Sequence, residues 1–386
     1  MKKVIQCLEN DLDGAGIFYK SFKYCHDEIR IPGVVYDNDK EITVAEHGET
    51  DKGLKTSKSL EKKSKKHKEY PPLFKYFLDG SRRTYKIDDV AYDNRIYPII
   101  AGQIGVGSCI RRNPDIFKAT KYLENNLVLS LPRCLDTDGK DARAFFDKLK
   151  NNLNNQEFLK KKNLYFSKIL DYDTELLKKK EGENYENRGI AKIQDEMVDL
   201  EKKIVEKLVK ADLLNQNNYL LKDGSLEYSE KGVTDKSYLL SVLKNNYRCV
   251  VGVSKSFDPE LFKDARGKSN AKSIAELEIF HRTPAYMMKS GIIKDVSFSI
   301  WYLRIRKTQN PFEGVLKIEK ILLDQEIESG LNSDEVDTIS ANIINERNPT
   351  CYGKDNRWAN HIYPVYLTES FIKSRYLSDI YFLNLF

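Results

Sequence analysis

The chain has 386 residues, of which 40% are hydrophobic and 32% are charged, and its formal net charge is +6. This length and hydrophobic content suffice for a core in one large domain or two modest ones. No apolar run is long enough to cross a membrane, and the start Met1-Lys2-Lys3 lacks the apolar region of a signal peptide, so we expect a cytoplasmic protein with no membrane contact. The six cysteines lack C-x-x-C spacing, which argues against a zinc site and a disulfide framework.

The first 69 residues are predicted to form a unit that precedes the main domain. An amphipathic helix around residues 8–24 and a short extended segment at residues 33–36 would serve contacts with a partner or a second copy of the chain. Eight lysines fall between Lys52 and Lys68, in a stretch with no apolar pattern, which predicts a mobile basic loop. This loop contacts phosphates near a DNA path, or it only increases solubility.

The tripeptide Asp-Gly-Ser follows an apolar run at two places, as residues 79–81 and as residues 223–225. An Asp at the end of a buried strand, followed by a Gly where the backbone turns, places a carboxylate at the sheet edge, where it can bind a metal ion. Asp-Gly is also a common hairpin turn with its Asp in solvent. The aromatic and apolar residues before each Asp favour the metal-binding interpretation of Asp79 and Asp223.

Between these two motifs, the sequence predicts first strands and then helices. Residues 97–107 and 127–131 are typical of strands that pair antiparallel beside the strand of Asp79. Residues 140–182 are highly charged with scattered apolar anchors, and they are predicted to form a protruding helical insertion for a partner or for DNA.

A long helix is predicted from Asn187 to Ala211, because apolar residues recur there at three- and four-residue spacing. At about 100° per residue, Glu206 falls opposite this apolar stripe and Glu196 falls well to one side. Glu201 lies at the edge of the stripe, where a carboxylate turned toward the core requires a cation or a metal. Glu201 is therefore the expected helix acid, unless its side chain extends outward to water.

The remaining elements complete one domain over residues 70–386. A helix at 238–246 and an apolar strand that leads to Lys255 follow the second Asp-Gly-Ser. An aromatic strand at 296–303 and helices at 333–346 and 366–377 come after them. The expected class is α/β, with a mixed sheet flanked by helices.

In this order, the motifs resemble the NurA nuclease family: Asp79-Gly80-Ser81, Glu201 on a long helix, the phrase at 223–226, and Cys249-Val-Val-Gly-Val-Ser-Lys-Ser256. The resemblance implies an RNase H-like fold similar to the PIWI domain of Argonaute, and manganese-dependent cleavage of DNA. It also implies a homodimer that works with a HerA-type hexameric ATPase, in DNA end processing or in anti-phage defence.

The resemblance carries over to individual residues. Asp79 matches the first metal-binding Asp, Glu201 the helix Glu, Asp223 the second Asp, and Lys255 a lysine at the end of the following strand. Near the C-terminus, Tyr363 matches the Tyr of a Tyr-Pro phrase. Glu369 stands where the family has a His.

The fourth metal ligand has three candidate interpretations. Glu369 substitutes for the His, since manganese and magnesium accept both donors. His361 reaches the site from the preceding loop, although a surface or hydrogen-bonded His is the commoner case. The third is that the fourth position is lost and activity is low.

The resulting hypothesis is a nuclease with two Mn²⁺ or Mg²⁺ ions about 4 Å apart, held by Asp79, Glu201, Asp223 and Glu369. Arg82 and Arg83 follow the first motif directly, and with Lys255 and His361 they are the expected contacts to DNA phosphates. A non-catalytic adaptor of the ATPase is the main alternative. Cleavage of RNA also stays open, because these residue types give no way to recognise a 2′-hydroxyl.

Overall fold

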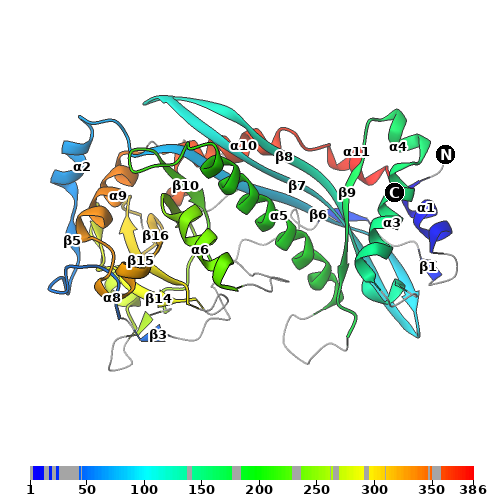
Figure 1. The fold of residues 1–386 in the computed structure, drawn as a ribbon, viewed down its shortest axis with the longest axis horizontal. Helices are drawn as coiled ribbons and strands as arrows, with labels where there is room; N and C mark the ends of the chain where they lie inside the picture. Colours follow the sequence, from blue (N-terminus) through cyan, green and yellow to red (C-terminus); the bar gives the residue numbers. More distant parts are fainter. Residues whose placement is uncertain are drawn as a thin grey trace.

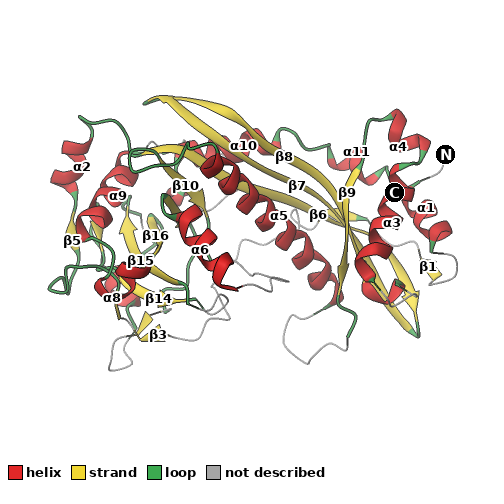
Figure 2. Ribbon diagram, viewed as in Figure 1, coloured by secondary structure: helices red, strands yellow, loops and turns green. Residues whose placement is uncertain are grey.

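This computed structural model describes residues 3–12, 17–19, 23–25, 43–44, 46–136, 141–175, 184–227, 236–260, 262–263, 269–290, 295–308, 310–346, 348–349 and 358–386. One mixed sheet, which has 14 strands in the described part of the chain, extends along the molecule (Figures 1 and 2). Helices lie against both of its faces. The expected extended segment at 33–36 lies outside the described residues.

Five strands form the centre of the sheet, in the order β8-β7-β6-β10-β11. β6 (Phe74–Tyr92), β7 (Arg95–Asn113) and β8 (Ile116–Pro132) form an antiparallel meander. β10 (Tyr219–Asp223) pairs parallel with β6, and β11 (Val250–Ser254) pairs parallel with β10. Two strands parallel to β6 thus follow the antiparallel meander in the order of the sheet. The predicted class, a mixed α/β sheet flanked by helices, is confirmed.

Further strands extend the sheet on both sides. β9 (Phe166–Tyr172) pairs parallel with β8. Beyond β11 come β16 (Val315–Ile321), β15 (Ser297–Arg304), β14 (Tyr286–Lys289) and β4 (Glu46–His47), each antiparallel to the last. The short strands are β1 (Ile17–Tyr19), β2 (Tyr24–Cys25), β5 (Lys58–Ser59) and β13 (His281–Arg282), with β3 (Thr43–Val44) and β12 (Phe262–Lys263) in a separate pair.

The two faces of the sheet carry different helices, and these faces decide the geometry of the site. We call the side covered by α5 (Tyr185–Lys210) and α6 (Lys236–Tyr247) the α5 face. The opposite side is the α10 face, covered by α9 (Ser333–Asn345) and α10 (Tyr363–Lys373). At the far end of the sheet, α1 (Val4–Asp11), α3 (Ala142–Asn154) and α11 (Asp379–Leu383) enclose a further apolar cluster. The other helices are α2 (Glu61–His67), α4 (Glu157–Lys161), α7 (Ala271–Ala275), α8 (Asp324–Ser329) and two 3-10 turns at Arg133–Leu135 and Trp358–Asn360.

The structure corrects the predicted helical insertion. α3 and α4 are helical as expected, but Phe166–Tyr172 is the strand β9. This segment pairs along β8, so it satisfies backbone groups that would otherwise be left at a sheet edge. Its buried positions, Phe166, Ile169 and Tyr172, recur every third residue, so they lack the strict alternation by which a half-buried strand is recognised.

Two predictions for the first 69 residues were also wrong. The N-terminal helix ends at Asp11 and is followed by β1 and β2, and glycines at positions 14 and 16 disfavour a longer helix. The expected basic loop contains α2, in which Lys65 pairs with Glu61 one turn away at 2.7 Å. Lys63 of the same helix pairs with Asp334 of α9 at 2.6 Å. α2 therefore packs on the domain. No helix in the described part of the chain has the length and apolar character to cross a membrane.

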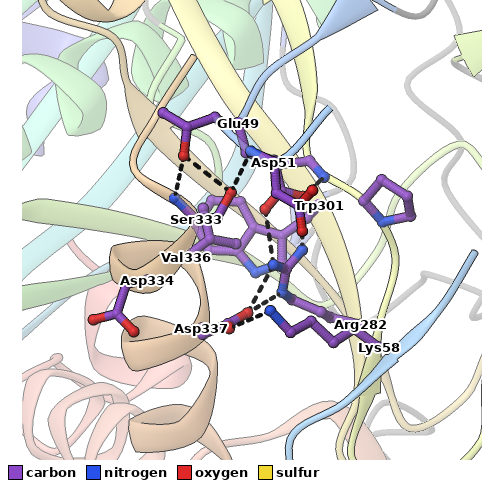
Figure 3. Close-up of polar contacts among 12 residues, drawn as sticks. Glu49, Asp51, Lys58, Arg282, Trp301, Ser333, Asp334, Val336 and Asp337 are labelled. Atoms are coloured by element: carbon purple, nitrogen blue, oxygen red, sulfur yellow. Dashed lines mark hydrogen bonds and ion pairs between the residues drawn. The ribbon is translucent and has the colours of Figure 1, made fainter. Parts of the chain in front are cut away.

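A buried ion cluster joins residues 49–59 to β13 and α9, at the end of the sheet opposite to α1, α3 and α11 (Figure 3). Arg282 of β13 is fully buried, and its guanidinium lies 2.8 Å from Glu49 and 2.7 Å from Asp337 of α9. Lys58 of β5 reaches the second oxygen of Asp337 at 2.7 Å. A buried cation is costly unless paired, so these carboxylates fix where residues 49–59 lie against α9.

We expect Asp337→Asn to lower the free energy of unfolding by about 1–2 kcal/mol, since the amide keeps an acceptor for Arg282 but loses the charge. Arg282 retains its contact with Glu49, which limits the loss. Urea unfolding measures the effect, with Asp334→Asn on the exposed side of the same helix as the control. The control should change stability by less than about 1 kcal/mol, and equal effects of the two variants would contradict the assignment.

Candidate active site

Asp79 lies in the middle of β6, not at its end as expected. It pairs with Gly107 of β7, and the strand continues without a turn through Ser81. Its side chain is on the α10 face: a Cβ on Gly107 would contact Ile372 of α10, and directly opposed residues of two paired strands share a face. The residue is 4% exposed, and within the described structure its Oδ2 has no hydrogen-bond partner.

The electrostatic environment of Asp79 disfavours its charged form. Burial raises the pKa of this carboxyl well above its usual range, and the nearby charges of Asp223 and Glu369 raise it further. A buried acid oxygen without a partner, beside other acids, is a costly arrangement of the kind found at functional sites.

Asp223 is the last residue of β10 and, like Asp79, points to the α10 face. The turn predicted after it is present, because Gly224 has a φ of 85°. Lys255, directly after β11, places its Nζ 2.7 Å from Asp223 Oδ2. Burial alone would raise the pKa of Asp223, but its ion pair and hydrogen bond with Lys255 outweigh this and lower it.

Glu369 reaches the same place from α10. It pairs with Lys373 one turn away at 2.6 Å. Burial opposes its charged form, but the charges of Lys255 and Lys373 lower the pKa of Glu369. The pKa of Lys255 is raised in turn, because Asp223, Glu369 and Asp79 together outweigh the effect of its burial. We call Asp79, Asp223, Glu369 and Lys255 the carboxylate cluster.

Glu201 is buried, as the helical pattern predicts, but it lies on the other face of the sheet. A Cβ on Gly80 would overlap its carboxylate, and Gly80 faces away from Asp79 along the strand. Lys222 points to this α5 face as well and pairs with Glu201 at 2.9 Å. The same Nζ donates to the backbone oxygens of Asp223 at 2.8 Å and Ser225 at 3.3 Å. Glu201 is thus neutralised by a lysine across the sheet from the carboxylate cluster.

The predicted phosphate contacts are engaged with the protein itself. Arg82 donates to Gln194 of α5 at 2.5 Å, and Arg83 pairs with Asp379 of α11 at 2.8 Å. These two arginines are consecutive in β6, so they leave the sheet on opposite faces.

The two residues expected from the Tyr-Pro segment lie around the start of α10. His361 is 4% exposed and lies 6.3 Å from the ring of Tyr366, centre to centre. Tyr363 is the first residue of α10, and its ring meets Phe117 edge-on at 6.2 Å.

Sequence reasoning missed two ion pairs between a lysine and a buried glutamate. It gave no partner to Glu201, although Lys222 shares the face of Leu220 by strand alternation. It also placed Glu196 well to one side of the apolar stripe of α5 and gave it no partner. That side is covered by β9, whose Lys168 pairs with Glu196 at 2.6 Å. The missed strand β9 is the reason for the second omission.

The donor chemistry of the carboxylate cluster suits a hard divalent cation, since its acids offer only oxygen ligands. As the side chains stand, the described residues contain no group of three or more His, Cys, Asp or Glu placed to hold a metal ion. The cation among the carboxylates is the ammonium group of Lys255. The partnerless Asp79 Oδ2 is the observation that fits a further cation.

Comparisons with known proteins give little beyond this geometry. No protein-family model and no curated protein matches the chain. Solved structures that are similar to it include the NurA nuclease from Sulfolobus solfataricus, at 11% identity and a TM-score of 0.40, over 81% of this chain and 85% of that chain. A likeness at this distance carries no argument about function, so the function must be argued from the site.

Proposed function

We propose that the protein is a metal-dependent nuclease that hydrolyses phosphodiester bonds in DNA. The observation that supports this most is the convergence of Asp79, Asp223 and Glu369, from two strands and a helix, around Lys255 on one face of the sheet. Stability alone does not favour one buried and two partly buried acids with two lysines, Lys255 and Lys373, because the like charges repel and the desolvation of each is costly. A divalent cation would compensate this excess of negative charge.

In this proposal Asp79, Asp223 and Glu369 hold one Mn²⁺ or Mg²⁺ ion. The bound ion supplies an activated water and stabilises charge on the phosphate. Lys255 keeps an ammonium group beside the reacting phosphate, where it can pair with a phosphate oxygen. The second ion expected from the sequence is not part of the proposal, because Glu201 lies across the sheet and is paired with Lys222.

The proposed biological setting rests on the motif resemblance alone. It comprises a homodimer and a HerA-type hexameric ATPase that feeds DNA ends to the nuclease, in end processing or in anti-phage defence. Because the cluster contains no group that reads bases, the choice of DNA would come from the partner and from the path to the site.

A second candidate function is a catalytically inactive adaptor of such an ATPase. The observation that favours it is the ion pair of Lys255 with Asp223, because this ammonium already provides a counter-charge where a metal would bind. The two functions differ in whether the protein binds a divalent ion and cuts DNA.

The experiment is cleavage of linear and circular DNA by the purified protein with Mn²⁺, Mg²⁺ or a chelator, alone and with the ATPase. We expect metal-dependent cleavage that falls by about 100-fold or more in Asp223→Asn, corresponding to about 3 kcal/mol of lost transition-state stabilisation. Glu206→Gln, on the exposed side of α5, is the control and should retain full activity. A folded protein that cuts under none of these conditions would support the adaptor.

A further inference from the structure

A cavity of about 180 Å³ lies beside the carboxylate cluster on the same face of the sheet. Its walls come from β8, from the loop between α4 and β9, and from the residues that follow α10. The side chains that matter for its chemistry are Asn125, Asn126, Asn163, Tyr165, Arg375 and Tyr376.

Strand register places this cavity close to the cluster. Asn125 of β8 pairs with Gly105 of β7, and Gly105 pairs with Ser81 of β6. Ser81 is two residues from Asp79 on the same face, which is about 7 Å along a strand. A Cβ on Gly105 would overlap Ile372 of α10.

Gly105 also lies close to two residues of the wall between the cavity and the carboxylate cluster. A Cβ on Gly105 would come within 3.1 Å of Tyr376 and 3.3 Å of Asn125, two of the cavity walls. Burial raises the pKa of the Tyr376 hydroxyl, and the nearby charge of Asp79 raises it further. Tyr376 therefore lies between the cavity and the carboxylate cluster.

One polar side chain of the cavity, Gln103, is hydrogen-bonded to Tyr85 and Leu377, whereas the other amides have no partner within the described structure. The amides of Asn125, Asn126 and Asn163 make no hydrogen bond with other described residues, although each offers both donors and an acceptor. Arg375 has no carboxylate partner among the described residues, and its guanidinium lies 5.1 Å from the centre of the Phe371 ring. Neither Asp nor Glu is among the residues that line the cavity.

The cavity also has an exposed aromatic side chain, Tyr165. Tyr165 is 61% exposed in the loop before β9, next to these amides. An apolar ligand would leave the amides and the guanidinium unpaired, which is costly. A nucleobase matches all of the groups, because its flat face stacks on a tyrosine and its edge carries the donors and acceptors that amides pair with. Arg375 can pair with the attached phosphate.

We propose that this cavity binds one base of a single-stranded nucleic acid, with Tyr165 as the stacking surface, the asparagines at the base edge and Arg375 on the phosphate. Bound in this way, the strand passes over Tyr376 and brings a neighbouring phosphodiester to the carboxylate cluster. This inference rests on the proposed nuclease function for its purpose, but the binding itself requires no metal and no cleavage.

The test is the binding of a fluorescein-labelled oligothymidylate of about 12 nucleotides to the full chain in chelator, followed by fluorescence anisotropy. Tyr165→Ala should raise Kd about tenfold, within the range for the loss of one stacked base. Arg375→Gln should also weaken binding and should lower its salt dependence by about one phosphate contact. Tyr165→Phe should bind as the wild type does, because it keeps the ring. Tyr70→Ala is the control, since Tyr70 is 54% exposed and lines a different cavity.

The outcomes separate this inference from the proposed function. Failure of the wild type to bind, or equal binding by Tyr165→Ala and Tyr70→Ala, would overturn it. If Tyr165→Ala weakens binding but the wild type cuts nothing with any metal, the cavity is supported and the nuclease is not. An oligouridylate of the same length shows whether the strand is DNA or RNA, and loss of its binding in Tyr165→Ala supports the cavity equally.

Discussion

Asp79→Asn is expected to abolish metal-dependent cleavage and, in chelator, to raise the midpoint of thermal unfolding. The buried Oδ2 of Asp79 has no partner in the described structure, and the pKa of this carboxyl is raised by burial, by Asp223 and by Glu369. A neutral amide of the same shape removes this repulsion, so the fold gains stability. It also removes a metal ligand, and we expect a loss of at least about 100-fold in cleavage rate.

Thermal unfolding with and without Mn²⁺ measures the stability and the metal binding, and a DNA cleavage assay measures the activity. Metal that binds only the folded protein raises the midpoint of the wild type, and this rise should be lost in Asp79→Asn. Asp93→Asn, at the exposed tip of the β6–β7 hairpin, should behave as the wild type in both conditions. A variant that is less stable in chelator and still cuts DNA would refute the role of Asp79.

Lys222→Met is expected to lower the free energy of unfolding by about 3–5 kcal/mol, because it leaves the carboxylate of Glu201 buried without its cation. Both side chains of this pair are about 5% exposed or less, so water cannot replace the lost partner. Replacing both residues, in Glu201→Met/Lys222→Met, should restore most of the stability, since apolar residues of similar size often substitute for a buried ion pair. Urea unfolding of the wild type, of the single variants Lys222→Met and Glu201→Met, and of the double variant gives the coupling energy.

The same pair yields a test of what Glu201 does. Glu201→Gln keeps an acceptor for Lys222, and we expect it to cut DNA within about tenfold of the wild type, because this side chain lies across the sheet from the cluster. A loss as large as that of Asp79→Asn would show that Glu201 acts in catalysis after all. A double Met variant as unstable as Lys222→Met would show that the buried charge is not the cause of the instability.

The acids of the carboxylate cluster could be identified from the sequence. Which of the candidate acids lie on the same face of the sheet could not. Asp79 and Asp223 were recognisable because each follows an apolar strand and precedes a glycine. The burial of Glu201 followed from its place beside the apolar stripe of α5. Helical periodicity shows which side of a helix is buried, but not which face of the sheet that helix covers. Gly80 faces Glu201, and Asp79 does not. This follows only from the register of β6 with β7 and the position of α5.

Fold prediction failed where tertiary contacts outweighed the local pattern. β9 has its buried residues at every third position, so its sequence resembled the helices before it, and only pairing with β8 makes it a strand. α2 has no apolar stripe from which a helix could be predicted. The ion pair of Lys65 with Glu61 and that of Lys63 with Asp334 of α9 stabilise it. The partner on α9 could not be inferred from the lysine-rich stretch itself.

The short strands near the N-terminus have a consequence for how the chain folds. β4 pairs with β14, roughly 240 residues later in the sequence, and β5 pairs with β13 over a similar separation. At a synthesis rate of about 5–20 residues per second, the partner strand of His47 is made roughly 10–50 s after His47 itself. Contacts of such long sequence separation also slow folding after release, because the closure entropy is lost before the pairing is gained. β4 and β5 are therefore expected to join the sheet last, and hydrogen exchange during refolding should protect them after β6 and β7.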